Sequence, residues 1–309
     1  MHRQDGTASS RGDVDAWGMS GTAATGARGQ AGTTGTHGYA SSGAPAAAPP
    51  VRRPDERAAV LVLAGVDPSG GAGIAADLQA VAGQGAHALT VVTALTAQDN
   101  DRVYHVQPVD SAMLLRQAEV LAAKIAIGAV KIGITGSAAN AQAIAGLIVR
   151  LRAHQPDLPV VLDPVLASGH GDLLSRDDAV LALAPLLPLV TVLTPNGPEA
   201  RALTGEDEPA AQARVLQARG CRHVLITGGH DAGDQVVNRW FGPEREQQWR
   251  WPRLPGGFHG SGCTLASSIA GLLAQQVPMA VALERAQRFC HHALEASYPI
   301  AAGQRIPLR

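Results

Sequence analysis

The chain has 309 residues, and its 25 basic and 26 acidic side chains leave it almost uncharged. Such a balance argues against nucleic acid or a membrane as a partner, because either would attract a basic surface. No stretch reaches the ~20 apolar residues of a membrane helix. The three cysteines are too few for a disulfide framework, and no CxxC or HExxH pattern indicates zinc. We therefore predict a cytoplasmic enzyme.

The first 50 residues contain no Leu, Ile or Phe, and Gly, Ala, Ser, Thr and Pro account for 35 of them. Such a segment cannot bury enough apolar surface to offset the entropy of ordering it. We predict a disordered, low-complexity extension over residues 1–57 and one α/β domain over residues 58–309. Arg52-Arg53 resembles the start of an export signal, but the following acidic residues and the short apolar run argue against export.

Beyond residue 58, short runs rich in Val and Leu alternate with longer helical stretches. The predicted strands are 60–64, 89–95, 129–132, 160–163, 190–193 and 224–227, followed by an antiparallel hairpin at 235–241 and 246–251. The predicted helices begin near 73, 113, 137, 260 and 279; the second extends to Ile127, and the first places Ile74, Leu78 and Val81 on one face. Continuous apolar strands separated by helices indicate a mainly parallel sheet covered on both faces. Ligands bind such sheets at the carboxyl ends of the strands.

A glycine-rich segment, Gly65 to Gly73, follows the first predicted strand and opens a helix. Glycines there allow a ligand to approach the backbone and its free N–H groups. Part of it matches a relaxed dinucleotide-binding fingerprint, which leaves a nicotinamide-dependent oxidoreductase as an alternative. The acidic residue that this fingerprint requires after the second strand is missing, however. An ordinary glycine-rich turn is the other interpretation.

Polar residues follow three further strands. Gln98 offers an adjacent donor and acceptor, which suits an aminopyrimidine edge, although a loop glutamine is often simply solvated. Asp163 suits Mg²⁺, or equally a turn or helix cap. Asn196 and Glu199 have the spacing of a capping box, a structural role that is compatible with a place near phosphate and metal.

The most specific segment is His259-Gly-Ser-Gly-Cys-Thr264, in which small residues open an apolar helix. Consecutive N–H groups at the positive end of a helix form an anion hole without a lysine. Cys263 falls in the first turn, where we expect a lowered thiol pKa; a buried structural cysteine is the alternative. We interpret His170, His230 and His291-His292 as ordinary surface or packing residues.

Together, these segments resemble the hydroxymethylpyrimidine/phosphomethylpyrimidine kinases of thiamine biosynthesis, within the ribokinase-like superfamily. The matching segments are 64–73, 93–98, 130–133, 161–165, 193–196 and 259–264. The resemblance implies a three-layer α/β/α fold and ATP-dependent phosphorylation of 4-amino-5-hydroxymethyl-2-methylpyrimidine and then of its monophosphate. It further implies ATP and Mg²⁺ as cofactors, a small pyrimidine as the substrate, and a homodimer. Pyridoxal kinases of the same superfamily are the nearest alternative.

The resemblance also assigns roles to individual residues. The pyrimidine would contact Gln98, Gly65 and Asp77, and the transferred phosphoryl group would contact Gly260, Ser261, Gly262 and Cys263. The nucleotide would contact Asn196, Thr227 and Gly229. Magnesium would be held by Asp163 and Glu199. Whether Cys263 accepts the substrate proton or helps to hold the phosphoryl group stays open. Two lysines that many members carry are absent, at Thr227 and immediately before Ser168-Gly169. A catalytically inert ligand-binding relative is therefore a third possibility.

Overall fold

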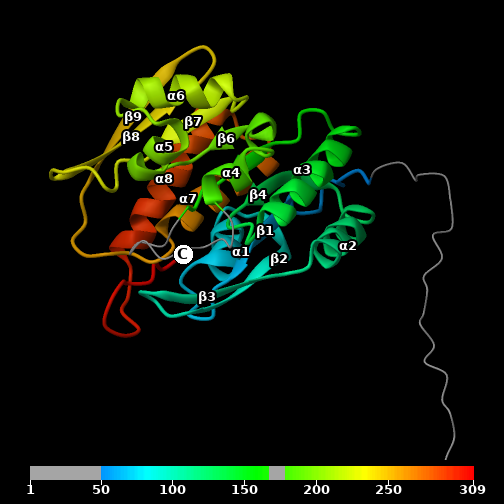
Figure 1. Ribbon diagram of the computed structural model, residues 1–309, viewed down its shortest axis with the longest axis horizontal. Coiled ribbons are helices and arrows are strands. Elements are labelled where there is room, and N and C mark those ends of the chain that lie inside the picture. The colour runs from blue at the N-terminus through cyan, green and yellow to red at the C-terminus, as the bar shows by residue number, and fades with distance from the viewer. Residues whose placement is uncertain (1–49, 167–177) are drawn as a thin grey trace, which may run out of the picture. The chain divides into compact units, whose positions relative to one another are not determined.

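The computed structural model describes residues 50–166 and 178–309 (Figure 1). Their centre is a nine-stranded sheet in the order β3-β2-β1-β4-β5-β6-β7-β8-β9. Strands β1, β2, β4, β5, β6 and β7 are mutually parallel, whereas β3 at one edge and the β8–β9 hairpin at the other are antiparallel to their neighbours. The predicted mainly parallel sheet is confirmed.

The strands are short at the centre of the sheet and long near its edges. Their bounds are β1 Ala59–Val66, β2 His87–Gln98, β3 Val103–Pro108, β4 Ile127–Ile132, β5 Val160–Leu162, β6 Val192–Leu193, β7 His223–Ile226, β8 Gln235–Phe241 and β9 Glu246–Pro252. The helices are α1 Gly73–Gly83, α2 Ser111–Ala122, α3 Ala138–Arg152, α4 Ala179–Leu183, α5 Gly197–Thr204, α6 Pro209–Ala218, α7 Ser261–Ala274 and α8 Met279–Glu295.

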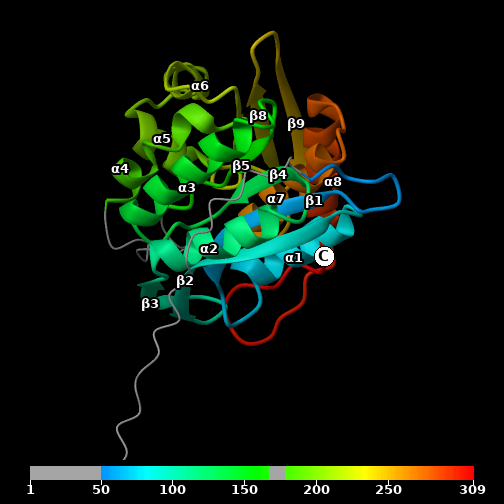
Figure 2. The ribbon, with the colours of Figure 1, turned by 90° about the vertical axis from the view of Figure 1, so that its right-hand side faces the viewer.

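Helices cover both faces of the sheet, so the described chain has three layers (Figures 1 and 2). Helices α2 to α6 contribute to one hydrophobic cluster, and α1, α7 and α8 contribute to the other. Each face of the sheet supplies alternate residues of the same strand; for example, Leu61 and Leu63 face the first cluster, whereas Val60 and Val62 face the second. This alternation explains why the strands read as continuous apolar runs.

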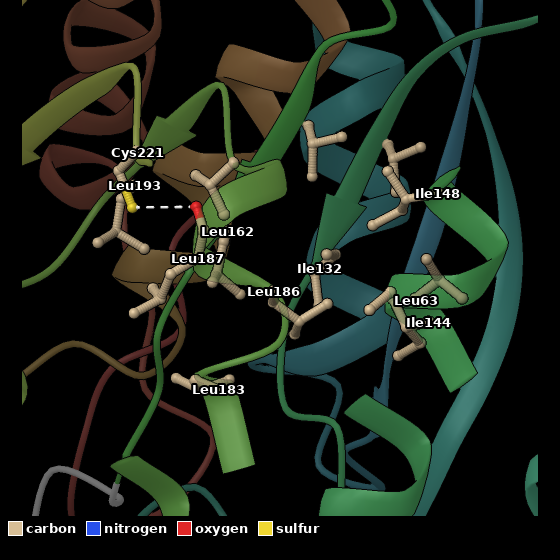
Figure 3. Close-up of a cluster of buried hydrophobic side chains, with 14 of the residues drawn as sticks. Leu63, Ile132, Ile144, Ile148, Leu162, Leu183, Leu186, Leu187, Leu193 and Cys221 are labelled. Carbon is tan, nitrogen blue, oxygen red and sulfur yellow. Dashed lines mark hydrogen bonds between the residues drawn. The ribbon is translucent and has the colours of Figure 1, made fainter. Parts of the chain in front are cut away.

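The first cluster is shown in Figure 3, where leucine and isoleucine side chains from the strands pack against α3 and α4. Leu63 and Ile132 lie near Ile144 and Ile148 of α3. The Cys221 thiol donates to the carbonyl of Leu187 at 3.5 Å, and burial raises its pKa to about 12. Cys221 is therefore an inert packing residue.

Several sequence-based boundaries were wrong. The second predicted helix ends at Ala122, and Ile127 instead begins β4. Leu78 points to solvent with 42% of its surface exposed, because α1 buries Ala76, Asp77, Ala80 and Val81. The edge strand β3 and helix α6 were not predicted. The proposed extension lies almost entirely within residues 1–49, which are outside the described residues, as are Ser168, Gly169 and His170.

No helix in residues 50–166 and 178–309 combines the length and the apolar character needed to cross a membrane.

Candidate active site

A cavity of about 850 Å³ opens at the carboxyl ends of the parallel strands. Residues immediately at or beyond the ends of β1, β2, β5, β6 and β7 line it, as do the β8–β9 hairpin, the start of α7 and the second half of α8. The lining includes these residues that the sequence placed in a site: Gly65, Gln98, Asp163, Asn196, Glu199, Thr227, Gly229, Gly260, Ser261 and Gly262. Segments nearly 200 residues apart in sequence thus meet in one cavity.

Helix α7 points its N-terminus into this cavity. Gly260 caps the helix with φ of +81°, a left-handed conformation that glycine adopts at little cost. The first turn contains no acidic residue. The first backbone N–H groups of a helix lack intrahelical partners, and here they belong to Ser261, Gly262 and Cys263. The site can therefore bind a phosphate or a developing oxyanion.

Two glycine loops lie against each other: residues 259–262 at the start of α7, and residues 70–73 after β1. Asp67 organises the loop after β1 by accepting hydrogen bonds from the Ser69 and Ala72 N–H groups at 2.8 and 2.7 Å. The same carboxylate meets His259 Nε2 at 2.8 Å, immediately before Gly260. Burial opposes ionisation of Asp67, but the hydrogen bonds and the charge of His259 outweigh it, so the pKa of Asp67 is lowered.

Two acidic side chains line the cavity near the start of α7. Asp163 is buried, and its Oδ2 has no hydrogen-bond partner among the described residues. Burial raises the pKa of Asp163 and of Glu199, and the charge of Asp163 raises that of Glu199 further. Glu199 also completes the predicted capping box, accepting from Asn196 N at 2.9 Å. An unpartnered buried carboxylate oxygen beside a second carboxylate is a setting that a cation would stabilise.

Asp77 does not line the cavity, so its predicted contact with the pyrimidine was wrong. It is fully buried in α1, where Oδ1 accepts from Lys131 Nζ at 2.7 Å and from Ser267 Oγ at 2.6 Å. A buried carboxylate requires such compensation, and a fully buried lysine requires it equally. Asp77 therefore joins α1, β4 and α7 below the site.

The expected low thiol pKa of Cys263 was also wrong. Cys263 is partly exposed to solvent and is absent from the cavity lining, but protein atoms crowd its thiol, which lies in the field of the Asp77 and Asp163 carboxylates. Burial raises the pKa of Cys263 to about 12, and these carboxylates add to the effect, whereas Lys131 and a hydrogen bond from the Gly73 backbone oppose it. The thiol is thus protonated at neutral pH, despite its position in the first turn of α7.

Some lining residues were missed or misread from the sequence. His230 and His291 line the cavity, although we had interpreted both as ordinary histidines. Beside His291, the Trp251 ring lies at a centroid distance of 5.2 Å, and Gln287 Oε1 accepts from Trp251 Nε1 and Asn238 Nδ2. No local motif marks these positions, because α8 and the hairpin come together only in the folded chain.

The parallel sheet between helices and the cavity at the strand ends, with a glycine-capped helix pointing into it, define a ribokinase-like phosphotransferase fold. A solved structure agrees with this class: the ADP complex of Bacillus subtilis pyridoxal kinase superposes with a TM-score of 0.74 at 28% identity. The match covers 82% of this chain and 97% of that one.

Sequence comparison narrows the class. The phosphomethylpyrimidine kinase family model matches residues 67–308, so the chain belongs to that family. The hydroxymethylpyrimidine/phosphomethylpyrimidine kinase of Rhizobium meliloti is 36% identical over 260 residues, covering 80% of this chain and 94% of that protein. The thiamine biosynthesis bifunctional protein ThiED of Geobacter sulfurreducens is 37% identical over 259 residues, and this chain spans only 52% of it.

Proposed function

We propose that this chain transfers the terminal phosphoryl group of ATP to the hydroxymethyl oxygen of 4-amino-5-hydroxymethyl-2-methylpyrimidine, and then phosphorylates the resulting monophosphate, as a kinase of thiamine biosynthesis. Family membership and the near-complete coverage of the Rhizobium meliloti kinase support this activity. The observation that carries the proposal is that Gln98 and the glycine-capped start of α7 line the same cavity.

The backbone at the start of α7 would stabilise the transferring phosphoryl group. The transition state spreads negative charge over three oxygens, so catalysis requires positioning and donors rather than covalent chemistry. The N–H groups of Ser261 and Gly262 are fixed in the first turn of the helix and add the positive end of the helix dipole. These groups keep their orientation before and during the reaction.

The opposite part of the cavity would hold the pyrimidine. Gln98 ends β2 and can both donate to and accept from an aminopyrimidine edge. Gly65, at the end of β1, lets the Ile134 side chain pack directly against the backbone, because a Cβ at this position would collide with the isoleucine. Gly65 and Ile134 both line the cavity, so they would form an apolar wall for a flat heteroaromatic ring.

The nucleotide would lie along Asn196, Thr227 and Gly229, which line the cavity beyond β6 and β7. The Bacillus subtilis relative in complex with ADP supports nucleotide binding by this fold. Asp163 and Glu199 would hold Mg²⁺, with phosphate oxygens and water completing its shell. Magnesium would neutralise the phosphate charge that these two carboxylates alone would repel.

Cys263 would act as a protonated neighbour of the phosphoryl site rather than as the base. Its raised pKa leaves little thiolate near neutral pH. The thiol lies close enough to Asp163 to donate a hydrogen bond to it, which lowers the pKa of that carboxyl. Cys263 would thus hold Asp163 in place under the anion hole.

Pyridoxal phosphorylation is the second candidate, because the pyridoxal kinase of Bacillus subtilis superposes over most of this chain. The test is a competition experiment with purified protein, ATP, Mg²⁺ and equal concentrations of the pyrimidine alcohol and pyridoxal, followed by mass spectrometry. We expect the pyrimidine monophosphate first and the diphosphate later. Preferential formation of pyridoxal phosphate would instead support the second candidate, and no phosphorylated product would contradict both.

We further propose a homodimer in the cytoplasm. The proposal rests on the family resemblance and on the use of ATP. Light scattering coupled to size-exclusion chromatography measures the oligomeric state, and a mass of one chain would contradict it.

A further inference from the structure

The guanidinium of Arg309 lies behind the two glycine loops, outside the lining of the cavity. Its Nη2 donates to the Gly71 carbonyl at 2.6 Å and, more weakly, to the Gly260 carbonyl at 3.4 Å. Its Nε donates to Thr264 Oγ1 at 2.7 Å. One side chain thus holds both the loop after β1 and the first turn of α7, although Arg309 is 238 positions away from Gly71 in the sequence.

The Gly260 carbonyl is the acceptor around which these contacts converge. It receives the Thr264 N–H at 3.0 Å and the Thr264 hydroxyl at 2.8 Å, in addition to Arg309. In a trans peptide, the C=O and the N–H of one unit point in opposite directions. Holding Gly260 O on the Arg309 side therefore keeps the Ser261 N–H pointing the other way, toward the cavity.

The same geometry holds at the other loop. Gly71 O accepts from Arg309, and the N–H of the same peptide unit, on Ala72, donates to Asp67 Oδ2 at 2.7 Å. Asp67 in turn contacts His259, the residue before Gly260. Arg309, the 71–72 peptide, Asp67 and the 259–260 segment therefore form a closed ring of contacts.

The glycines make such a ring necessary. A Cβ at Gly260 would collide with Gly71 O, so the two loops pack backbone against backbone. Glycine lowers the barrier to rotation of the adjoining peptides, and Gly260 already has a φ of +81°. A backbone with this freedom presents its N–H groups in one orientation only when its carbonyls are held.

We propose that Arg309 is a positioning residue for phosphoryl transfer: by holding Gly71 O, Gly260 O and Thr264, it keeps the Ser261 N–H directed at the transferred phosphoryl group. Arg309 is absent from the cavity lining, so it would act through the backbone of the loops rather than directly on substrate or nucleotide. Its removal would loosen a donor that acts in the transition state, so kcat falls while the KM values for ATP and the pyrimidine stay nearly constant. This inference rests on the proposed kinase activity.

The test compares Arg309→Ala, Arg309→Lys and wild type in the two-substrate assay. A misplacement of about 1 Å in a catalytic group lowers the rate by ~10²-fold, and we expect a kcat loss of this order for Arg309→Ala with KM values within about threefold. The lysine side chain of Arg309→Lys keeps the charge but cannot bridge three separated acceptors. We therefore expect its kcat to lie between those of wild type and Arg309→Ala. Arg288→Ala is the matched control, since Arg288 lies on α8 and pairs with Glu284 in solvent.

Chemical rescue distinguishes the proposed positioning role from a purely structural one. If Arg309 is a positioning residue, free guanidinium at a non-denaturing concentration should restore part of the kcat of Arg309→Ala, but should change neither wild type nor Arg288→Ala. If kcat of Arg309→Ala equals that of wild type, or if KM rises without a loss of kcat, the inference is wrong. If Arg309→Ala does not fold, Arg309→Lys provides the test, because a kcat of Arg309→Lys equal to that of wild type would overturn the inference. An inactive wild type would instead contradict the proposed function.

Discussion

Lys131 and Asp77 form an ion pair in the interior of the protein, with Nζ 2.7 Å from Oδ1 and both side chains fully buried. Lys131 lies in β4 and Asp77 in α1, and Ser267 of α7 donates to the same carboxylate oxygen. The pair lies below the start of α7, where its charges act on Cys263. It therefore connects the sheet to the two helices that carry the glycine loops.

Removing one partner of this pair should destabilise the protein strongly. Asp77→Asn leaves the Lys131 charge buried without its counter-ion, which costs about 3–5 kcal/mol of unfolding free energy. The double variant Asp77→Leu/Lys131→Met removes both charges, and we expect it to be more stable than Asp77→Asn. Urea unfolding followed by circular dichroism measures both values.

The exposed pair Arg150 and Glu119, 3.1 Å apart, is the matched control. Breaking it with Glu119→Gln should change the unfolding free energy by no more than about 1 kcal/mol, because solvent screens the charges. Equal effects of Asp77→Asn and Glu119→Gln would mean that burial does not determine the contribution of the Lys131–Asp77 pair.

Gln98→Ala should weaken binding of the pyrimidine alcohol and spare that of ATP. The loss of a paired donor and acceptor costs roughly 1–3 kcal/mol, or about 10–100-fold in KM for the alcohol. Steady-state kinetics with each substrate varied in turn provide the measurement. Gln107→Ala, on the exposed side of the neighbouring strand β3, is the control. An unchanged KM for the alcohol would remove Gln98 from the pyrimidine site.

Cys263→Ala separates the two roles left open by the sequence. If the thiol stays protonated, as its raised pKa indicates, the variant keeps the backbone donors and loses on the order of tenfold in kcat. A thiolate base would instead require a loss of roughly 10²–10⁴-fold. The sign of the pKa shift adds a second readout: alkylation of Cys263 by iodoacetamide should be far slower at pH 8 than that of free cysteine. Rapid alkylation at that pH would contradict the raised pKa.

His223 should make the stability depend on pH. Burial, aided by the charge of Arg222, lowers the pKa of His223 to about 4, and Trp240 Nε1 donates to its Nδ1 at 3.3 Å. The unfolded chain binds this proton near the ordinary histidine pKa of about 6.5, so stability is lost as the pH falls from that value toward 4. His223→Asn keeps an acceptor without the titration. Its Tm should therefore fall less than that of wild type between pH 7 and pH 5, and parallel curves would exclude His223 as the cause.

The fold followed from the sequence wherever apolar runs were continuous. Strand β1, the β8–β9 hairpin and the start of α7 were placed within two residues, because burial on both faces or strict alternation leaves a clear pattern. The edge strand β3 has exposed Tyr104 and His105 and gave no such pattern. Helix α6 was missed although Pro209 begins it.

The candidate site was less completely predictable, because polar residues take their roles from partners distant in sequence. Asp77 was assigned to the site, but in the folded chain its carboxylate pairs with Lys131, which is 54 positions away in the sequence. The pKa of Cys263 depends on burial and on two carboxylates from other elements, which outweigh its place at a helix start. Nothing local to Arg309 indicates its contact with Gly71.

The most direct test of the account is a structure of the protein with a non-hydrolysable ATP analogue, Mg²⁺ and the pyrimidine alcohol. We predict that the terminal phosphate contacts the Ser261 and Gly262 N–H groups, with the pyrimidine edge at Gln98 and the hydroxymethyl oxygen directed at the phosphorus. A terminal phosphate bound away from the start of α7, or a pyrimidine that does not reach Gln98, would contradict the assignment of this cavity as the phosphoryl-transfer site.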